Sequence, residues 1–326
     1  MTKILETSFA GLSLSNPIIV ASSGLTNTVQ KNKELEKAGV GALVLQSLYE
    51  EQLSKQSAEL LMKSSYFESG DPALAYLEHN HVDYYLQLIR ETKAQCTIPV
   101  IGSVNCYKDD SWMDFAQQIE SAGADAIELN IFVLSTEIYD EPHFLEKTYI
   151  RIAQKVKESV RIPVILKIGK YCNHIVHLVD RLYTIGVSGV VLFNRFYQPD
   201  IDINKLQMTS GNLFSSSGEI SDTLRWTGII SGELPQMPVA ASAGVHDWED
   251  VIKCILAGAS AVQICSTLYQ NGNEIIAAMK QSMEEWMLHM NFGSITEFQG
   301  KLNYAHIEDP SLYERIQFIR YFANRD

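Results

Sequence analysis

The sequence of 326 residues predicts an α/β protein that forms a single (β/α)8 barrel, the TIM barrel. Two short phrases alternate along the chain, and each of them introduces an apolar run of strand length. Helix-like stretches separate the runs, for example at residues 111–121 and 149–160. Eight buried strands that alternate with helices are typical of this closed barrel, whereas an open doubly wound sheet is the alternative.

The first phrase is Ala or Ile, then glycine, then an apolar run. It occurs at residues 38–45, 122–129, 185–192 and 257–264. Glycine adopts the left-handed backbone conformation without a steric penalty. The phrase therefore indicates a helix that ends on glycine and is followed at once by a buried strand.

The second phrase is a proline that opens a short apolar run, at residues 16–20, 98–101, 162–166 and 237–240. Proline is tolerated at the first residue of a strand, because the ladder needs no donor there. The two phrases take turns along the chain. They predict strands near residues 17–21, 41–46, 99–104, 125–130, 163–168, 188–194, 238–242 and 260–265.

Three segments lie outside this repeat. Residues 7–15 predict a hairpin that plugs the bottom of the barrel, and residues 195–217 form a long polar excursion between the sixth and seventh strands. The last 23 residues carry apolar side chains at helical spacing, namely Leu312, Ile316, Ile319 and Phe322. We therefore expect a barrel domain over residues 1–303 and a C-terminal helical extension over residues 304–326.

The chain is acidic, with 26 Lys and Arg against 39 Asp and Glu and a net charge of −13. This balance argues against a nucleic-acid or anionic-membrane partner, because both are polyanions that attract basic surfaces. No uncharged apolar run reaches about 18 residues, and none follows the start, so we expect a cytoplasmic protein. The five cysteines lie at least ten residues apart without a CxxC pair, so we expect neither a metal cluster nor a disulfide framework.

The active site of such a barrel lies at the carboxyl ends of its strands. Small residues follow the seventh and eighth predicted strands, where backbone N–H groups can approach a phosphate because no side chain intrudes. Lys167 follows an apolar run, and a buried ammonium either stabilises a developing anion or forms a Schiff base. Asn130 and Asn194 carry amides that donate and accept, which suits a planar, amide-rich ring. The strand ends hold Ala21, Ser22, Ser23, Gly24, Gln46, Ser47, Ser103, Asn130, Lys167, Asn194, Ser242, Ala243, Gly244, Cys265 and Ser266.

Short motifs spread over residues 5–303 resemble one known family. The motifs are Asn16-Pro17, Ala21-Ser22-Ser23-Gly24, Asp83-Tyr84-Tyr85, Glu128-Leu129-Asn130, Lys167, Asn194, Ala243-Gly244-Val245, Gly258-Ala259, Val262-Gln263-Ile264 and Phe298-Gln299-Gly300-Lys301-Leu302. Each motif is short, but together they are specific. They are similar to the FMN-dependent dihydroorotate dehydrogenases, especially the soluble branch, and to the related flavin domain of dihydropyrimidine dehydrogenase.

The resemblance implies a bound FMN and assigns its contacts. The phosphate would lie on the backbone amides of Ala243-Gly244 and Cys265-Ser266, and the isoalloxazine ring against residues 21–24. Lys167 would lie near the N1/O2 edge, where its charge stabilises the anionic reduced flavin. The further cofactor contacts would be Gln46, Ser47, Ser103, Asn130 and Gly218, and the substrate contacts Gln46, Asn80, Asn130, Asn194 and Arg195.

The sequence departs from the family at several of these positions. Val133 stands where the soluble members carry a catalytic cysteine, and a valine cannot take the proton that leaves C5 of the substrate. Ser135 is a candidate base, because the membrane-linked branch uses serine. Gln46 replaces a lysine of the family, Arg195 replaces a small residue, and residues 76–82 replace the substrate loop.

We therefore expect an FMN-dependent oxidoreductase that acts on a CH–CH bond of dihydroorotate, orotate or a related small planar anion of pyrimidine metabolism. Two alternatives stay open, a non-catalytic flavin-binding paralogue that has lost its base and an aldolase that forms a Schiff base on Lys167. The family implies a homodimer. A nicotinamide-linked reaction would need a separate electron-transfer partner, since the sequence has no cysteine cluster.

Overall fold

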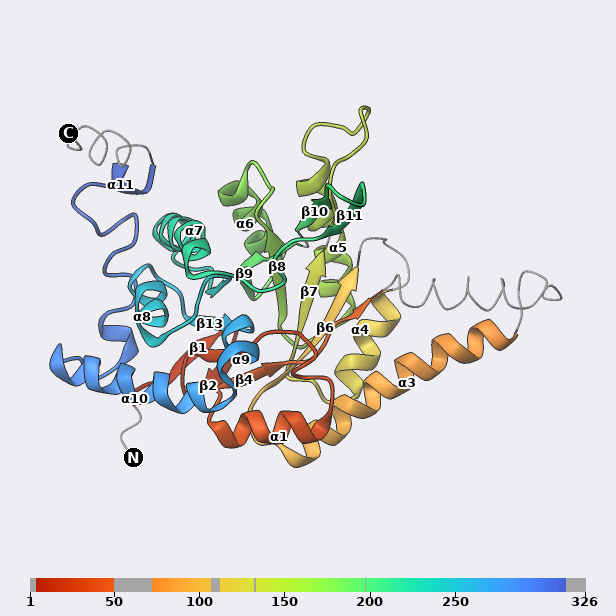
Figure 1. Ribbon diagram of the computed structural model, residues 1–326, viewed down its shortest axis with the longest axis horizontal. Helices are drawn as coiled ribbons and strands as arrows, with labels where there is room; N and C mark the ends of the chain where they lie inside the picture. The colour runs from red at the N-terminus through yellow and green to blue at the C-terminus, as the bar shows by residue number, and fades with distance from the viewer. Residues whose placement is uncertain (1–3, 50–71, 107–111, 132, 197, 315–326) are drawn as a thin grey trace.

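Eight parallel strands close into the predicted barrel, with helices around its outside (Figure 1). The computed structural model describes residues 4–49, 72–106, 112–131, 133–196 and 198–314. The barrel strands are β3 (Ile18–Val20), β4 (Ala42–Val44), β6 (Val100–Cys106), β7 (Ala126–Ile131), β8 (Val164–Gly169), β9 (Gly189–Asn194), β12 (Val239–Ser242) and β13 (Ala261–Ile264). Pairing of β4 with β6 closes the ring, and the two-residue strand β5 (Leu48–Tyr49) adds to the end of β6. All eight strands predicted from the sequence are confirmed.

Both phrases have the structural meaning expected of them. Positive φ angles near helix ends mark the four glycines of the first phrase, Gly39, Gly123, Gly186 and Gly258. In the second phrase, backbone carbonyls accept hydrogen bonds of 2.8–3.0 Å from the neighbouring strands at Pro17, Pro99, Pro163 and Pro238. Each proline thus pairs with the neighbouring strand through its carbonyl group, and at the start of a strand the ladder does not need the N–H group that proline lacks.

The outer layer consists of α1 (Val29–Ala38), α3 (Pro72–Gln95), α4 (Trp112–Ser121), α5 (Phe144–Ser159), α6 (Ile175–Thr184), α7 (Ile220–Glu233), α8 (Trp248–Leu256) and α10 (Glu274–His289). Helix α8 illustrates why these sequences are helical. Asp247 caps its N-terminus by accepting from the backbone N–H of Asp250 at 2.9 Å. Val251 and Ile255, four residues apart, are fully buried on the face toward the barrel.

Residues 7–15 form the expected hairpin, β1 (Thr7–Phe9) and β2 (Leu12–Leu14). Its buried side chains pack against an apolar layer to which every barrel strand contributes. The strand residues of this layer are Ile19, Ala42, Val44, Ile101, Ala126, Ile165, Val191, Ala240 and Ala261. Because the layer and the hairpin fill the lower bore of the barrel, they leave the carboxyl ends of the strands for a ligand.

The excursion between β9 and β12 contains an antiparallel hairpin, β10 (Pro199–Asp202) and β11 (Gln207–Ser210). It ends in the short helix η1 (Ser217–Glu219) before α7. The expected polar excursion is not polar throughout. It exposes large apolar side chains at Ile201, Ile203, Leu206, Met208 and Leu213.

The expectation of a substrate loop at residues 76–82 is wrong, because this segment lies inside helix α3. The local sequence contains no proline or glycine that would end a helix there. Asn80 is therefore a helical residue, and its side chain lies outside the described part of the structure.

The described part of the C-terminal extension packs on α7. Tyr304 donates its backbone N–H to the carbonyl of Gly228 at 3.0 Å, and Arg225 Nε donates to the carbonyl of Tyr313 at 3.0 Å. The extension contains helix α11 (Ser311–Glu314), whereas Ile316, Ile319 and Phe322 lie outside the described residues. Among the helices that are described, none combines the length and the apolar character needed to cross a membrane.

Candidate active site

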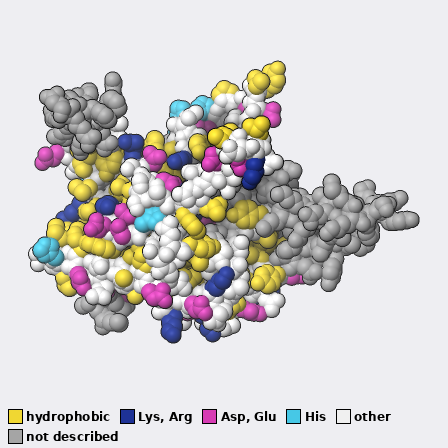
Figure 2. Space-filling view, viewed as in Figure 1, with side chains coloured by type: hydrophobic (Ala, Val, Ile, Leu, Met, Phe, Trp, Pro, Cys, Tyr) yellow, Lys and Arg dark blue, Asp and Glu magenta, His cyan; other side chains and the backbone are white. Residues whose placement is uncertain are grey.

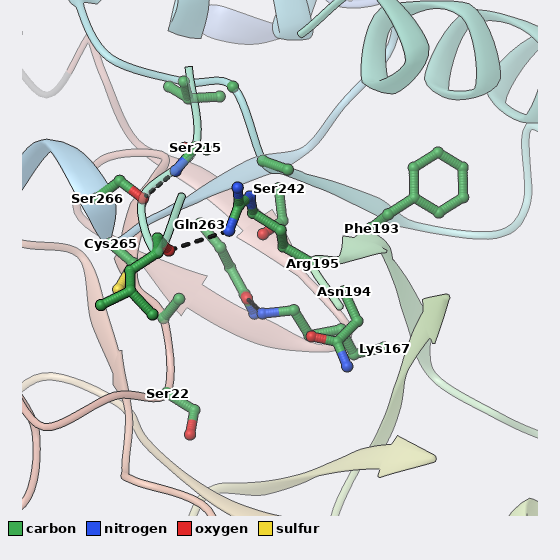
Figure 3. A pocket seen from close by; sticks show the side chains of 15 residues that line it. Ser22, Lys167, Phe193, Asn194, Arg195, Ser215, Ser242, Gln263, Cys265 and Ser266 are labelled. Carbon is green, nitrogen blue, oxygen red and sulfur yellow. Dashed lines mark hydrogen bonds between the residues drawn. The ribbon is translucent and has the colours of Figure 1, made fainter. Parts of the chain in front are cut away.

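A pocket of about 200 Å³ opens at the carboxyl ends of the barrel strands, and most of its wall comes from β8, β9, β12, β13 and the segments that follow them (Figure 3). Ten of the residues predicted from the sequence line it. They are Ala21, Ser22, Lys167, Asn194, Arg195, Ser242, Ala243, Gly244, Cys265 and Ser266. These residues are up to 245 positions apart in the chain, and the barrel brings them together because parallel strands all end on the same rim.

The turn after β12 forms one end of the pocket. Ala243 and Gly244 have φ angles of +76° and +80°, so two consecutive residues are in the left-handed region. A Cβ atom on Gly244 would lie 2.2 Å from the backbone nitrogen of Ile220, so only glycine fits there. The Thr223 hydroxyl fixes the turn by donating to the carbonyls of Ser242 and Ala243 at 3.0 and 3.1 Å. Successive backbone N–H groups in a turn of this kind can bind an anion.

Lys167, from β8, lies on the floor of the same pocket. It is 6% exposed, and its Nζ donates to Oε1 of Gln263 at 2.8 Å. Gln263 in turn donates from Nε2 to the carboxylate of Glu128, which is completely buried. Figure 3 shows the side chains of Lys167 and Gln263 extending toward each other. The pocket therefore has a positive charge on its floor and a buried negative charge behind it.

Asn130 ends β7 next to this floor and pairs in register with Lys167 of β8. It is 7% exposed, and its side-chain oxygen has no hydrogen-bond partner within the described structure. A buried acceptor without a donor is costly, by about 1–3 kcal/mol, unless a ligand or water supplies the donor. Asn130 does not itself line the pocket as defined above.

A chain of hydroxyl groups leads from the pocket into the barrel. Ser22 Oγ is 2.9 Å from Ser47 Oγ, which is 2.7 Å from Ser103 Oγ. Behind Ser103, the Tyr85 hydroxyl accepts from its backbone N–H at 2.7 Å and donates to its carbonyl at 3.0 Å. Burial raises the pKa of Tyr85 strongly, so this hydroxyl stays protonated. The predicted residues Ser47 and Ser103 therefore lie behind the wall and hold Ser22 in place.

The other predicted residues lie around the pocket and not in its wall. Ser23 accepts from the backbone N–H of Leu25 at 3.2 Å and donates to the carbonyl of Ala21 at 3.3 Å. Gly24 lies against the Tyr269 hydroxyl, Gln46 lies between β4 and β5, and Gly218 lies in η1. Their roles as cofactor contacts stay predictions.

Cys265 follows β13 and lines the pocket. Burial raises the pKa of its thiol above the ordinary value of 9.0, although a hydrogen bond to Ser23 and the charge of Lys167 act in the opposite direction. The thiol is therefore neutral at neutral pH and is a poor nucleophile. Among the described residues, no group of three His, Cys, Asp or Glu is arranged to hold a metal ion.

Arg195 holds the returning part of the excursion over the pocket. Its Nε donates to Glu219 at 3.1 Å, its Nη1 to the carbonyl of Leu213 at 3.0 Å and its Nη2 to the carbonyl of Asn212 at 2.8 Å. We call residues 211–217 the strap. The guanidinium is thus engaged by the protein itself, and its contact with substrate stays a prediction.

The strap is also tied to the loops that follow β12 and β13. The backbone N–H of Ser215 donates to Ser266 Oγ at 2.9 Å, and Ser215 Oγ lies 3.0 Å from Nε2 of His246. Leu213 and Ser215 line the pocket, so the strap forms one of its walls. Only the tertiary structure could show this wall, because the strap sequence has no motif that points to a site.

Five lining residues were absent from the sequence-based set: Phe193, Leu213, Ser215, Val245 and Gln263. Gln263 carried a usable signal, since it is a polar residue in the middle of the apolar strand β13. Glu128 carried the same signal in β7. A polar side chain inside a buried strand needs a partner across the barrel, and here each is the other's partner.

The loop after β7 holds the two residues that concern the missing base. Val133 is half-buried and packs against the main hydrophobic core, and it is not among the residues that line the pocket. Ser135 is exposed and donates to Oδ2 of Asp140 at 2.7 Å. Neither residue reaches the pocket wall in this arrangement.

Comparison with known proteins identifies similar chains. The profile of a family described as Dihydroorotate dehydrogenase matches residues 4–287. A dihydroorotate dehydrogenase B (NAD(+)), catalytic subunit, of Thermoplasma volcanium is 26% identical over 306 residues, which cover 91% of this chain and 97% of that protein. A putative dihydroorotate dehydrogenase A (fumarate) of Aeropyrum pernix is 26% identical over 93% of this chain and 97% of its own. The NAD-dependent dihydropyrimidine dehydrogenase subunit PreA of Escherichia coli is 23% identical over 93% of this chain and 78% of its own.

Proposed function

Because the chain belongs to the dihydroorotate dehydrogenase family and is an oxidoreductase of that kind, we propose that it binds FMN and acts on a CH–CH bond of dihydroorotate or a related small planar anion. Members of this family are flavoproteins. The observation that carries the proposal is the pairing, in one pocket, of the turn at Ala243-Gly244 with the buried ammonium of Lys167.

The residues present fit an FMN group. Ala243 and Gly244 line the pocket in a left-handed turn that would present backbone amides to a phosphate, and Ser266 lines the same pocket. Lys167 supplies a positive charge for the ring, and Asn130, which pairs in register with Lys167 behind the pocket wall, has an unpartnered oxygen that would accept from a ring N–H. When bound, FMN accepts or returns the hydride that the protein side chains cannot carry.

The chain's own residues would orient the substrate and stabilise charge. Asn130 near the end of β7 and Asn194 at the end of β9 lie on either side of β8 and would present amides to a planar ring. Lys167 stabilises negative charge as it develops, because its ammonium is held in a site from which water is largely excluded. The family match leaves the Schiff-base aldolase without support, since dehydrogenases are the relatives found.

Ser135 is our proposed base. Its hydrogen bond to Asp140 orients the hydroxyl and gives its proton a carboxylate to move to. Because both side chains lie outside the pocket wall, the loop at residues 133–143 has to approach the substrate for this role. Asp140→Asn would then slow turnover with little change in cofactor affinity.

One observation favours a second candidate, a flavin-binding protein without dehydrogenase activity. Val133 stands at the position where the related soluble enzymes would hold their base. Its side chain packs against the hydrophobic core, which is a structural role. Val133→Cys tests this candidate directly. A gain of dihydroorotate oxidation in V133C, with none in the wild-type protein, would favour it.

We propose a homodimer that pairs through the β10–β11 hairpin, in the cytoplasm. Ile201 and Met208 are cross-strand partners on one face and are 60% and 69% exposed, and Ile203 and Leu206 at the tip are 78% and 85% exposed. Figure 2 shows hydrophobic side chains in this part of the surface, interspersed with charged and other side chains. A two-stranded hairpin alone is marginal in water, so a covered apolar face would stabilise it. Ile201→Asp should yield monomers in sedimentation, whereas Thr209→Asp on the other face should not.

The decisive experiment is a visible spectrum of the purified protein, followed by addition of dihydroorotate without oxygen. We expect flavin absorbance that bleaches within minutes. A separate electron-transfer protein would then be needed to pass electrons to a nicotinamide. A colourless protein that retains no FMN after reconstitution would refute the proposed function.

A further inference from the structure

The floor of the pocket is crossed by a chain of three side chains, Lys167, Gln263 and Glu128, whose two ends carry opposite charges. They come from β8, β13 and β7 and are almost fully buried, with exposed fractions of 6%, 2% and 0%. In the ring of eight strands, β13 and β7 are four strands apart in either direction. The hydrogen bond between Gln263 and Glu128 therefore spans the full bore of the barrel.

The chemistry of the two ends fixes which way the Gln263 amide points. An ammonium only donates hydrogen bonds and an ionised carboxylate only accepts them, whereas an amide does both. The Gln263 oxygen must therefore face Lys167, and its nitrogen must face Glu128, as the contacts show. In the reverse orientation the Gln263 nitrogen would face the Lys167 ammonium, donor against donor, and its oxygen would face the Glu128 carboxylate, acceptor against acceptor. Glu128 thus sets the polarity of an amide on the far side of the barrel.

This polarity determines where the Lys167 charge lies. A lysine head is a point charge on a flexible stem, and nothing in its shape fixes a direction. One of its three N–H groups is committed to Gln263 at 2.8 Å, while the side chain also lines the pocket. The remaining N–H groups are available to a ligand from a fixed position.

We propose that Gln263 is a positioning residue for the reaction and that Glu128 acts on Lys167 through it. The inference rests on the proposed function, because the anion to be stabilised is the reduced cofactor. Held in place by Gln263, the Lys167 ammonium favours reduced over oxidised FMN. A charge-assisted hydrogen bond in a buried site is strong enough for this effect to be measurable.

A purely structural role makes a different prediction. A broken buried network lowers the stability of the fold wherever it lies, because polar groups lose their partners. The preference for reduced over oxidised FMN changes only if the Lys167 head moves. The midpoint potential of the bound flavin therefore separates positioning from folding.

The test compares Gln263→Met with the wild-type holoprotein. Methionine has a similar length and packs in the bore, but it cannot anchor the ammonium. We expect the ratio of affinities for reduced and oxidised FMN to fall roughly tenfold, which makes the midpoint potential about 30 mV more negative. Glu128→Gln should shift it in the same direction, because a neutral amide no longer fixes the orientation of Gln263.

A matched control is Asn32→Leu. Asn32 is also fully buried, and its amide donates to Thr92 Oγ1 at 3.0 Å between α1 and α3, away from the pocket. We expect this variant to melt at a lower temperature than the wild type and to keep the wild-type potential. Thermal unfolding of each apoprotein measures the loss of stability separately.

A double-mutant cycle tests whether Gln263 acts through Lys167. In a Lys167→Met background, Gln263→Met should cause no further shift in potential. Wild-type potentials in both Q263M and E128Q would overturn the inference, as would an equal shift by Q263M in the presence and absence of Lys167. If the wild-type protein holds no FMN, the proposed function fails first, and the inference fails with it.

Discussion

The floor and the strap are two walls of the same pocket that are held in different ways. The floor joins Lys167 to Gln263 and Glu128 between opposite strands, with almost no solvent contact. The strap is held by Arg195 and Glu219, whose side chains are 18% and 23% exposed. Buried charge networks lose several kcal/mol when one partner is removed, whereas ion pairs with solvent access contribute less, about 0–1 kcal/mol when fully exposed. The comparison indicates a rigid floor for chemistry and a more easily opened wall for entry.

The largest effect is expected on the floor, from Lys167→Met. Removal of the ammonium takes away the charge in the pocket and leaves Glu128 without its counter-charge. We expect flavin reduction to slow by a factor of about 10² or more, a typical result for loss of a positioned electrostatic group. Stopped-flow absorbance measures the rate.

Lys170→Met is the matched control for this change. Lys170 is exposed and pairs with Asp222 at 3.6 Å, so its loss should leave the reduction rate within about twofold. Equal rates in the K167M variant and the wild type would show that the floor charge has no part in the reaction.

The next largest effect is expected at the anion end, from Gly244→Ala. The left-handed φ of +80° and the approach to Ile220 leave no space for a methyl group, so the turn has to shift. We expect FMN affinity to fall roughly tenfold or more, with about 1–3 kcal/mol lost from the free energy of unfolding. Fluorescence titration of the apoprotein with FMN measures the affinity.

Gly123→Ala is a control that introduces backbone strain away from the pocket. Gly123 follows the end of α4 and has a φ of +96°, but no described atom lies within 4 Å of the place that an added methyl group would take. This variant should lose stability and keep its FMN affinity. A similar loss of affinity in both glycine variants would mean that strain alone explains the effect.

A smaller effect is expected at the strap, from Glu219→Gln. The substitution keeps the shape of the side chain but removes its charge, which weakens its hold on Arg195 and on the backbone N–H of Ser216. We expect FMN release to accelerate about threefold to fivefold, in line with an ion pair worth up to about 1 kcal/mol. Release into an excess of a flavin-scavenging apoprotein, followed by fluorescence, gives the rate.

Asp222→Asn provides the comparison for the strap, because Asp222 lies near Glu219 in sequence but pairs with Lys170 and Arg225. It should release FMN at the wild-type rate. If E219Q also matches the wild type, the strap is held by its Ser215 contacts and the floor and strap differ less than we infer.

The smallest effect concerns pH. Burial raises the pKa of the Cys265 thiol above its ordinary value of 9.0, so the folded protein binds this proton more tightly than the unfolded chain does. The corresponding contribution to stability is present below the ordinary pKa and is lost as the pH rises above it. Alkylation of Cys265 by iodoacetamide should therefore stay slower than that of a free thiol up to about pH 9. Labelling at the free-thiol rate at about pH 8 would contradict this, and Cys265→Ser identifies the signal.

Much of the site could be predicted because of where the strands end. The Pro and Gly phrases located the strands, and the barrel geometry then placed Lys167, Gly244 and Ser266 on one rim. The polar network around Lys167 was harder to find, because Gln263 is 96 residues away from Lys167 and lies on the strand opposite that of Glu128. Sequence spacing carries no information about which side chains meet across a bore.

The sequence by itself determined the barrel, its eight strands, its plug and the rim on which a ligand binds, because periodic burial and backbone chemistry at Pro and Gly are local properties. Only the tertiary structure decided two further features: the strap that Arg195 holds over the pocket and the charged chain across its floor. These depend on contacts between segments far apart in the chain. Their energies come from burial and from partners that the folded barrel alone supplies.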